Sequence, residues 1–366
     1  MRYRRIAVKI GSNVLTRQDG RLNLTRMSAL VDQIAELHKK AVEIILISSG
    51  AVASGRSEIK AKGKLDSVSA RQLYSAVGQA KLINRYYDFF KEHGIACGQV
   101  LTTKESLGTR RHYLNQKNCV GLMLENRVIP IMNENDTISV TELMFTDNDE
   151  LSALVASMMN VDALIILSNI DGIYDGPPND TRSKVIREIN YSKSSQNEHG
   201  DISDFIQTSK SSFGRGGMLT KYNIARKLAL EGIPVIIANG TSPNILPNLL
   251  QKDADVVCTH FLSSGKDTSN LKKWIAHSES FTKGEIYINQ GAQEALLGEK
   301  ARSLLAVGIT AINGEFEKDD IVRIFDQNKV PIGLGKVSFN SLELSSLIGQ
   351  KANKAVIHYN YLHISE

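Results

Sequence analysis

Short apolar runs alternate with longer amphipathic stretches over the first 260 residues of the chain. The runs are rich in β-branched residues and predict strands at Ile6–Ile10, Glu43–Ile47, Ala96–Leu101, Val128–Met132, Ala163–Leu167 and Pro234–Ala238. Apolar residues recur every three or four positions in Thr25–Lys40, Ala70–His93 and Met218–Glu231, which predicts helices. Strands this apolar, separated by helices, are typical of a mainly parallel sheet covered on both faces. We therefore expect an α/β fold, a three-layer αβα sandwich.

The pattern changes after residue 260. Residues 263–280 are polar and predict a linker. Beyond them, short alternating segments predict strands at Glu285–Ile288, Ile321–Phe325 and Ala355–Tyr359, with turn signals between them. We expect a catalytic domain over 1–262, a linker over 263–280 and a small β-barrel domain over 281–366. Residues 173–216 are also polar, and they are either a mobile insertion over the site or an inert surface loop.

Composition and charge narrow the class of protein. With 366 residues, 42% apolar and 23% charged, the chain is typical of globular proteins and not of disordered ones. A net charge of +5 invites a nucleic-acid or membrane-surface interpretation. However, the charge is polarised: +12 over residues 1–117, −6 over 118–280 and −1 over 281–366. The nearly neutral third segment argues against an RNA-binding barrel.

Cysteine usage and hydropathy indicate a cytoplasmic protein. Cys97, Cys119 and Cys258 are odd in number and widely spaced, which fits neither a disulfide framework nor a zinc site. No apolar run approaches the roughly 18–20 residues of a membrane span. The basic start is followed by a short apolar stretch that contains Lys9, which a cleavable signal peptide excludes.

The first two predicted strands are followed by small polar residues. Lys9 stands inside an apolar strand, and burying a lysine requires an anionic partner. Gly11-Ser12-Asn13 follow it, and Ser48-Ser49-Gly50-Ala51 follow the second strand. Both turns offer backbone N–H groups to an anion. The alternatives are a lysine that reaches solvent from an edge strand and a plain strand-to-helix turn.

Two acidic clusters follow the fourth predicted strand. Asn133-Glu134-Asn135-Asp136 comes directly after it, and Asp147-Asn148-Asp149-Glu150 opens a helical run. Clustered carboxylates and amides bind a metal or an ammonium group. Helix capping explains part of the second cluster without any function, but it does not explain the first.

A glycine-rich stretch, Phe213–Lys221, runs directly into a helix. It lacks the Gly-Lys-Ser/Thr of a Walker A motif, and no G-x-G-x-x-G follows the first strand. A flexible connector is the alternative. Taken together, the motifs indicate a nucleotide site with two lysines, a glycine-rich cradle and a separate acidic pocket. Phosphoryl transfer depends mainly on positioning and charge neutralisation. A carboxylate acceptor is already ionised at pH 7, so no general base is required.

These motifs occur in the order seen in the glutamate 5-kinases of the amino-acid kinase superfamily, which the chain resembles over nearly its whole length. The resemblance extends to Ala76-Val77-Gly78-Gln79 and Tyr113-Leu114-Asn115. The last segment, with Gly314-Glu315-Phe316, resembles the PUA domain of bacterial members. The implied architecture is an amino-acid kinase fold followed by a PUA domain.

The resemblance implies that ATP and L-glutamate give ADP and L-glutamyl 5-phosphate, the first step of proline biosynthesis, with Mg²⁺ carried by the nucleotide and no protein metal ligands. Lys9 and Lys221 would stabilise the transferring group, and Asp149 would hold both lysines. Glutamate would be bound by Ser49, Asn133, Asp136 and Asn148, with Asp147 nearby. ATP would be bound by Lys9, Ser168, Asn169, Arg215, Gly216, Gly217, Met218, Leu219, Thr220 and Lys221. Ser168-Asn169 stands where the family commonly has Thr-Asp, and Arg215 where a small residue is frequent.

Members of this family form dimers or tetramers and are inhibited by proline, and both properties are expectations for this chain. The nearest alternative is a related kinase acting on aspartate, acetylglutamate, carbamate or a nucleoside monophosphate. An RNA-binding protein is the alternative from another class, because PUA domains occur in RNA-modifying enzymes. The double acidic motif and the C-terminal domain favour glutamate.

Overall fold

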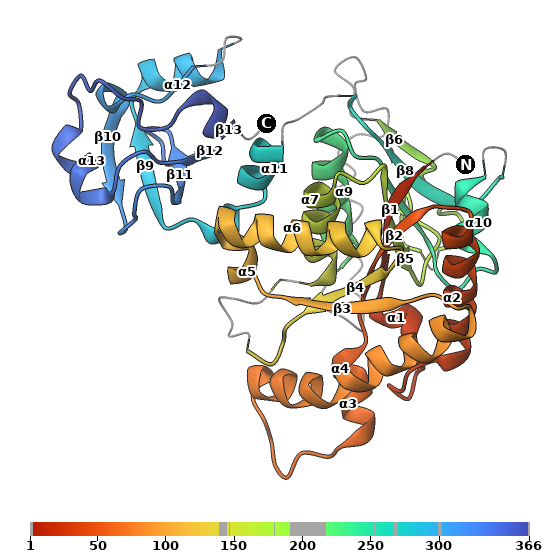
Figure 1. Ribbon diagram of the computed structural model, residues 1–366. Coiled ribbons are helices and arrows are strands. Elements are labelled where there is room, and N and C mark those ends of the chain that lie inside the picture. The colour runs from red at the N-terminus through yellow and green to blue at the C-terminus, as the bar shows by residue number, and fades with distance from the viewer. Residues whose placement is uncertain are drawn as a thin grey trace. The chain divides into compact units, whose positions relative to one another are not determined.

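The computed structural model describes residues 3–138, 145, 147–178, 180–190, 217–251, 254–265, 270–298 and 302–364. These form two compact units (Figure 1). The first unit contains Met1–Leu107 and Leu114–Asp267, and the second contains Gly108–Tyr113 and Thr268–Glu366. Within the segment where we expected a linker, 263–280, the structure has the helix α11 (Asn270–Ala276) and the start of the 3-10 turn Glu279–Phe281.

The first unit is built on an eight-stranded sheet with the order β3-β4-β2-β1-β5-β7-β8-β6. Its strands are β1 (Arg5–Ile10), β2 (Glu43–Ser48), β3 (Cys97–Thr102), β4 (Ile129–Glu134), β5 (Ala163–Ser168), β6 (Glu188–Asn190), β7 (Val235–Asn239) and β8 (Cys258–Leu262). The described helices of residues 1–262 are α1 (Ser12–Leu15), α2 (Leu24–Lys39), α3 (Ala51–Glu58), α4 (Ser67–Glu92), α5 (Glu105–Gly108), α6 (Arg110–Glu125), α7 (Asn148–Met159), α9 (Met218–Leu230) and α10 (Ile245–Leu250).

The sheet is parallel from β3 to β7, as the apolar runs predict. Each of the predicted strands in this unit overlaps an observed one. The other edge differs, because β8 is antiparallel to β7 and β6 pairs with β8. The expectation of a loop over 173–216 is wrong for its first part. Ile173, Ile186 and Ile189 are buried, and β6 lies in this stretch; residues 191–216 lie outside the described residues.

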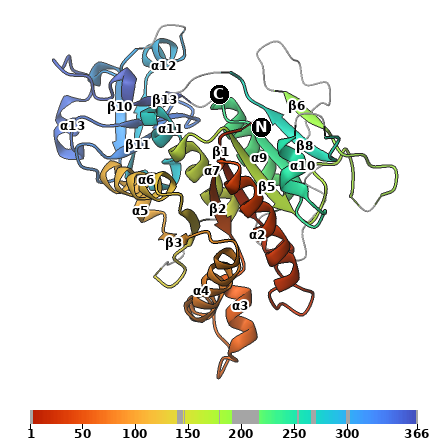
Figure 2. The same ribbon diagram turned by 45° about the vertical axis from the view of Figure 1, so that its right-hand side comes forward.

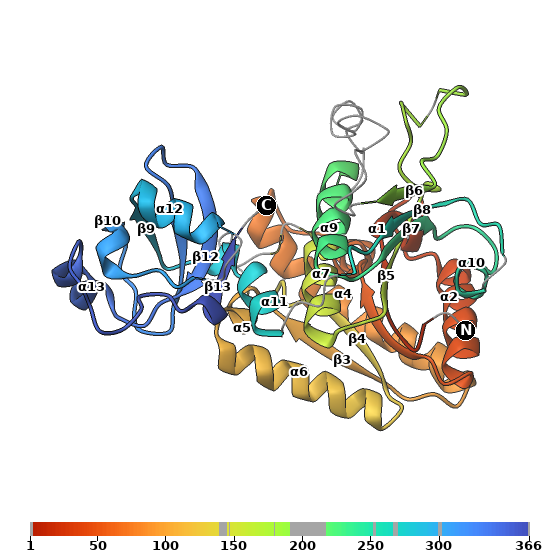
Figure 3. The same cartoon turned by 90° about the horizontal axis from the view of Figure 1, so that it is seen from above.

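Helices cover both faces of the sheet (Figure 3). Side chains of α2, α4 and α10 share one apolar core with Ile6, Val8 and Ile10 of β1. α7 packs on the other face, against β1, β2, β4 and β5, and α9 packs beside it on β7 and β8. Because alternate residues of a strand point to opposite faces, Lys9 points away from the α2 core and toward α7 and α9. The position of one lysine in the strand therefore determines which helices it meets.

α3 and α4 lie side by side (Figure 2), and glycines bring their backbones together. A Cβ atom at Gly78 of α4 would lie 1.8 Å from the carbonyl oxygen of Ala51, and one at Gly55 of α3 would lie 1.8 Å from that of Tyr74. No side chain fits at either position, because the obstacle is backbone. α3 also begins directly after Gly50, whose φ of 108° favours glycine.

Gly78→Ala is therefore expected to destabilise the first unit by about 3 kcal/mol, since backbone would have to move to admit one methyl group. The matched control is Gly121→Ala in α6, where a Cβ would meet nothing within 4 Å. Alanine there is expected to leave stability unchanged or raise it by up to about 1 kcal/mol. Thermal unfolding of both variants checks this, and equal melting temperatures would contradict it.

The second unit contains a five-stranded sheet with the order β10-β9-β11-β12-β13. Its strands are β9 (Gly284–Ile288), β10 (Ile309–Asn313), β11 (Ile321–Phe325), β12 (Pro331–Lys336) and β13 (Leu362–Ile364), and its other described helices are α12 (Gln290–Leu297) and α13 (Ser341–Leu347). The predicted strand Ala355–Tyr359 is wrong. Ile357 forms an isolated bridge to Leu304 instead of belonging to a strand. Val356 and Ile357 are both buried, so the segment lacks the alternation of buried and exposed side chains on which the prediction depended.

The three cysteines are free thiols, as their spacing predicts. Within the described ranges, no helix combines the length and the apolar character that crossing a bilayer would need.

Candidate active site

A buried ion-pair triad lies where β1, α7 and α9 meet. The Nζ atom of Lys9 is 2.6 Å from Asp149 Oδ1, and the Nζ atom of Lys221 is 2.9 Å from Asp149 Oδ2. The side chain of Asp149 is 1% exposed, and those of the lysines are 6% and 10% exposed. Asp149 and Lys221 stand in the first turns of their helices. One carboxylate thus holds two ammonium groups close to each other, which leaves the triad with a net charge of +1.

The two carboxyls at the start of α7 have different environments. Burial alone would raise the pKa of Asp149, but Lys9 and Lys221 together outweigh it and hold that pKa below its usual range. Burial, together with the neighbouring Asp149, raises the pKa of Asp147. Asp147 caps the helix, since its Oδ1 accepts hydrogen bonds from the N–H groups of Asp149 (2.8 Å) and Glu150 (3.1 Å). Its Oδ2 is buried without a hydrogen-bond partner in the described structure.

Asp149→Asn is expected to lower the free energy of unfolding at pH 7 by about 3–5 kcal/mol, because it leaves two buried ammonium groups without their carboxylate. The folded-state pKa of Asp149 is lowered, so its stabilisation is complete above the unfolded pKa of about 4 and is lost as the pH falls through the folded value. The difference in the free energy of unfolding between wild type and variant should therefore become smaller below about pH 4.

Urea titrations at pH 7 and pH 3.5 measure this difference. Asp255→Asn is the matched control, since that side chain is 89% exposed and its change should matter little at either pH. A wild-type advantage over Asp149→Asn that is the same at both pH values would show that Asp149 does not carry it.

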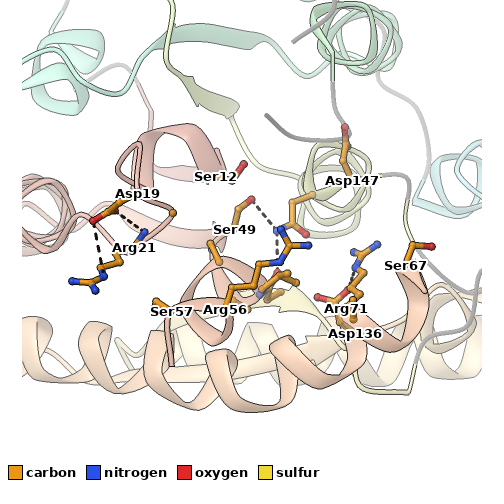
Figure 4. A pocket seen from close by; sticks show the side chains of 18 of the residues that line it. Ser12, Asp19, Arg21, Ser49, Arg56, Ser57, Ser67, Arg71, Asp136 and Asp147 are labelled. Carbon is orange, nitrogen blue, oxygen red and sulfur yellow. Dashed lines mark hydrogen bonds and ion pairs between the residues drawn. The ribbon is translucent and has the colours of Figure 1, made fainter. Parts of the chain in front are cut away.

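A cavity of about 870 Å³ opens at the start of α7, where Asp147 and Asn148, the two residues before Asp149, belong to its lining (Figure 4). It lies between the segments that follow β1, β2 and β4 and the helices α3, α4 and α7. Its lining includes all four side chains that the resemblance assigns to glutamate, together with Asp147: Ser49, Asn133, Asp136, Asp147 and Asn148. The structure thus brings together residues that are up to 99 positions apart in the chain.

Amide side chains fix this wall of the cavity. Asn148 Nδ2 donates to Asn133 Oδ1 at 2.9 Å and lies 3.1 Å from Ser49 Oγ. Asn133 Nδ2 in turn donates to Gln79 Oε1 at 2.7 Å. A chain of hydrogen bonds therefore runs from α4 through the end of β4 to α7, and it orients the polar groups before any ligand binds.

A partly buried cation of the cavity lining was not identified from the sequence. Arg71 of α4 forms ion pairs with both Glu134 and Asp136, and its side chain is 16% exposed. Burial raises the pKa of Glu134 to about 7; Arg71 opposes that rise and Asp136 adds to it. Glu134 was part of the acidic motif without an assigned role. No signal marked Arg71, because an arginine in a long amphipathic helix is usually a solvent-facing residue.

Of the described residues assigned to ATP, Lys9 lies on β1, Ser168 and Asn169 lie at the end of β5, and the others lie at the start of α9. Ser168 is the buried last residue of β5, and Asn169 after it is exposed. Gly217 precedes α9 without a side-chain cap, so the N–H groups of its first turn are available to an anion. Met218, Leu219, Thr220 and Lys221 form that first turn. Arg215 and Gly216 lie outside the described residues.

Known protein families and proteins are similar to this chain over most of its length. The model of the amino acid kinase family matches residues 4–239, and that of the PUA domain matches residues 284–359. A glutamate 5-kinase from Bacteroides thetaiotaomicron is 67% identical over 363 residues, which cover 99% of each chain. A glutamate 5-kinase from Chlorobaculum tepidum is 46% identical, over 99% of this chain and 98% of its own. A solved UMP kinase from Bacillus anthracis aligns with a TM-score of 0.48 and 15% identity, over 72% of this chain and 97% of its own.

The buried Lys9–Asp149–Lys221 triad and the polar cavity thus occur in a chain for which both relatives described above, similar over nearly their full length, are glutamate 5-kinases. The chain belongs to the amino acid kinase family and, within it, to the glutamate 5-kinases, and it carries a PUA domain.

Proposed function

We propose that this protein is a glutamate 5-kinase, which transfers the γ-phosphoryl group of ATP to the side-chain carboxylate of L-glutamate. The product is L-glutamyl 5-phosphate, and the reaction is the first step of proline biosynthesis. The observation that carries the proposal is that the start of α7 contributes both to the buried Lys9–Asp149–Lys221 triad, through Asp149, and to the lining of the polar cavity, through Asp147 and Asn148. The phosphates of ATP and the acceptor carboxylate are both anions, and they would meet at the triad. The cavity would hold the rest of the α-amino acid.

The charges of the site fit a carboxylate acceptor. The acceptor oxygen is already ionised at neutral pH, so the site needs cations that bring two anions together and no general base. Lys9 and Lys221 supply two positive charges at one point. Asp136 lies in the cavity, where its carboxylate would bind the substrate's ammonium group, with Ser49, Asn133 and Asn148 bonding to the rest of the substrate.

Asp149 acts through the lysines and is a positioning residue. It holds each ammonium group by a separate carboxylate oxygen, so neither lysine has to be ordered again when the reaction begins. Preorganised charge of this kind stabilises a phosphoryl group as negative charge moves between donor and acceptor oxygens. The lysines are therefore the catalytic groups in this proposal.

ATP is the phosphoryl donor because the chain is a member of a kinase family. The uncapped start of α9, Ser168 and the two lysines would hold its phosphates. Mg²⁺ bound to the phosphates would neutralise part of their charge. The described residues contain no group of three or more His, Cys, Asp or Glu side chains placed to hold a metal, and both oxygens of Asp149 already face lysines. The proposal places the ion on the nucleotide phosphates.

A test of the proposed function measures ADP release with ATP and each acceptor in turn. L-glutamate is expected to be the preferred acceptor over L-aspartate, N-acetyl-L-glutamate, carbamate and UMP. Trapping the product with hydroxylamine identifies it as an acyl phosphate. Rapid ADP release with another acceptor and none with L-glutamate would reject the proposal.

The remaining expectations belong to the same proposal. Proline carries the α-ammonium and α-carboxylate of an amino acid, so it is expected to compete for the same cavity; steady-state inhibition measures this. A dimer or tetramer is expected in solution, and light scattering measures the mass. A cytoplasmic location stays part of the proposal, and nucleic acid is not among the proposed partners.

A further inference from the structure

Arg71 is the feature of the cavity that the proposed mechanism does not use. We infer that its guanidinium binds the α-carboxylate of the amino-acid substrate and so selects α-amino acids over simpler acids and amines. The inference rests on the proposed function and deepens it, since it concerns how the same cavity recognises its acceptor.

The placement of Arg71 is fixed from two sides. Its Nη2 is paired with Glu134 Oε2 and its Nε with Asp136 Oδ1 (Figure 4 shows Arg71 beside Asp136). Glu134 is itself immobilised: its side chain is 1% exposed, and its Oε1 accepts a hydrogen bond from the N–H of Phe145 at 2.8 Å. Arg71 is therefore anchored by a buried carboxylate at the end of β4 while it lines the cavity.

Burial distinguishes Arg71 from the other cations of the lining. The side chain of Arg71 is 16% exposed, whereas that of Arg21 is 73% exposed. Arg56 and Lys60 are also exposed. A partly desolvated guanidinium binds a carboxylate more strongly than one in open solvent. Among the described cations of the lining, Arg71 is the one placed to contribute substantial binding energy.

The charge pattern matches the head group of an amino acid. An α-amino acid carries an ammonium group and a carboxylate on the same carbon atom. Arg71 and Asp136 form the complementary pair, one cation and one anion in direct contact. If the substrate's ammonium binds Asp136, its α-carboxylate must lie within a few ångströms, against Arg71. Substrate binding then replaces the ion pair between Arg71 and Asp136 with two ion pairs, one from each residue to the substrate.

Glu134 makes this exchange feasible. A guanidinium has five N–H donors in a planar fork and binds carboxylates with defined geometry. Arg71 can therefore stay paired with Glu134 while the substrate's carboxylate replaces Asp136. Glu134 is a positioning residue in this account. It holds the Arg71 guanidinium in the cavity wall when Asp136 pairs with the substrate instead.

The test compares L-glutamate with 4-aminobutyrate, which lacks only the α-carboxylate. Dissociation constants are measured by isothermal titration calorimetry with wild type and Arg71→Met, so the comparison does not depend on turnover. We expect Arg71→Met to weaken L-glutamate binding by about 10²-fold, the range for losing a hydrogen bond to a charged group. Binding of 4-aminobutyrate should change by no more than about threefold, because it makes no contact that Arg71 supplies.

Two further variants keep the result interpretable. Arg71→Lys retains the charge without the fork and should bind L-glutamate with intermediate affinity. Arg85→Met removes a partly exposed arginine from the same helix, away from the cavity, and should leave both dissociation constants unchanged. Melting temperatures of all variants report any loss of folding.

The outcomes separate this inference from the proposed function. A variant Arg71→Met that still discriminates between the two compounds by the wild-type factor overturns the role of Arg71 and leaves the kinase proposal intact. Wild type that neither binds nor phosphorylates L-glutamate rejects the proposed function itself.

Discussion

Replacing Lys9 by methionine is expected to lower kcat for L-glutamate by about 10²-fold or more, the size of effect seen when a preorganised charge contact is removed from a transition state. Methionine retains the apolar stem of the side chain but not the ammonium group. That group is held 2.6 Å from Asp149 and lies at the carboxyl end of β1, on the face of the sheet that meets α7 and α9. The KM for L-glutamate should change far less than kcat.

Steady-state kinetics with saturating ATP measures both constants. Lys64→Met is the matched control: it removes the same charge from an exposed position outside the cavity lining and should behave as wild type. A variant Lys9→Met with near wild-type turnover would remove Lys9 from the catalytic groups. A lowered melting temperature accompanied by normal kcat would assign Lys9 a role in folding alone.

Replacing Asp136 by alanine is expected to raise the KM for L-glutamate by about 10²-fold, because the substrate's ammonium group loses its charged acceptor. The KM for ATP should not change, since Asp136 lies in the cavity wall that follows β4 and not among the residues assigned to ATP. The internal check is glutarate, which lacks the ammonium group. Its kcat/KM should be nearly the same in wild type and variant.

Asp19→Ala supplies the control for this substitution. Asp19 also lines the cavity, but its side chain is 55% exposed and is near Arg21, so its loss should have little effect. An unchanged KM for L-glutamate in Asp136→Ala would show that the ammonium group is bound elsewhere, and Asp147, with its buried Oδ2, would be the next candidate.

Much of the sheet could be predicted from sequence, because its central strands are buried on both faces and are therefore apolar throughout. The ends of those strands also indicated where polar groups converge, since parallel strands end at the same edge. Lys9, Ser49 and Asn133 were found in this way, each at or just after a strand end. Strands in the later part of the chain were harder to predict. β6 lies in a polar segment, and the neighbouring residues Val356 and Ile357 are both buried, so they show no alternation of buried and exposed positions.

The part of the site that could not be predicted depends on long-range pairing. Arg71 meets Glu134 and Asp136 across more than sixty residues of sequence, and nothing near it in the chain records those partners. The opposite holds for the capping of α7 by Asp147, which is local and visible in the sequence. Sequence reasoning therefore found the acidic half of the charge pattern and missed the basic half.

The close contact between α3 and α4 also limits how this protein can be re-engineered. Both helices line the cavity, yet every substitution at Gly55 or Gly78 would destabilise the protein, because any side chain would collide with backbone. Variation in acceptor choice has to come from side chains that face the cavity, such as those of Arg71, Asp136 and Asn148. Directed evolution toward other amino-acid acceptors should therefore target those positions and leave the glycines untouched.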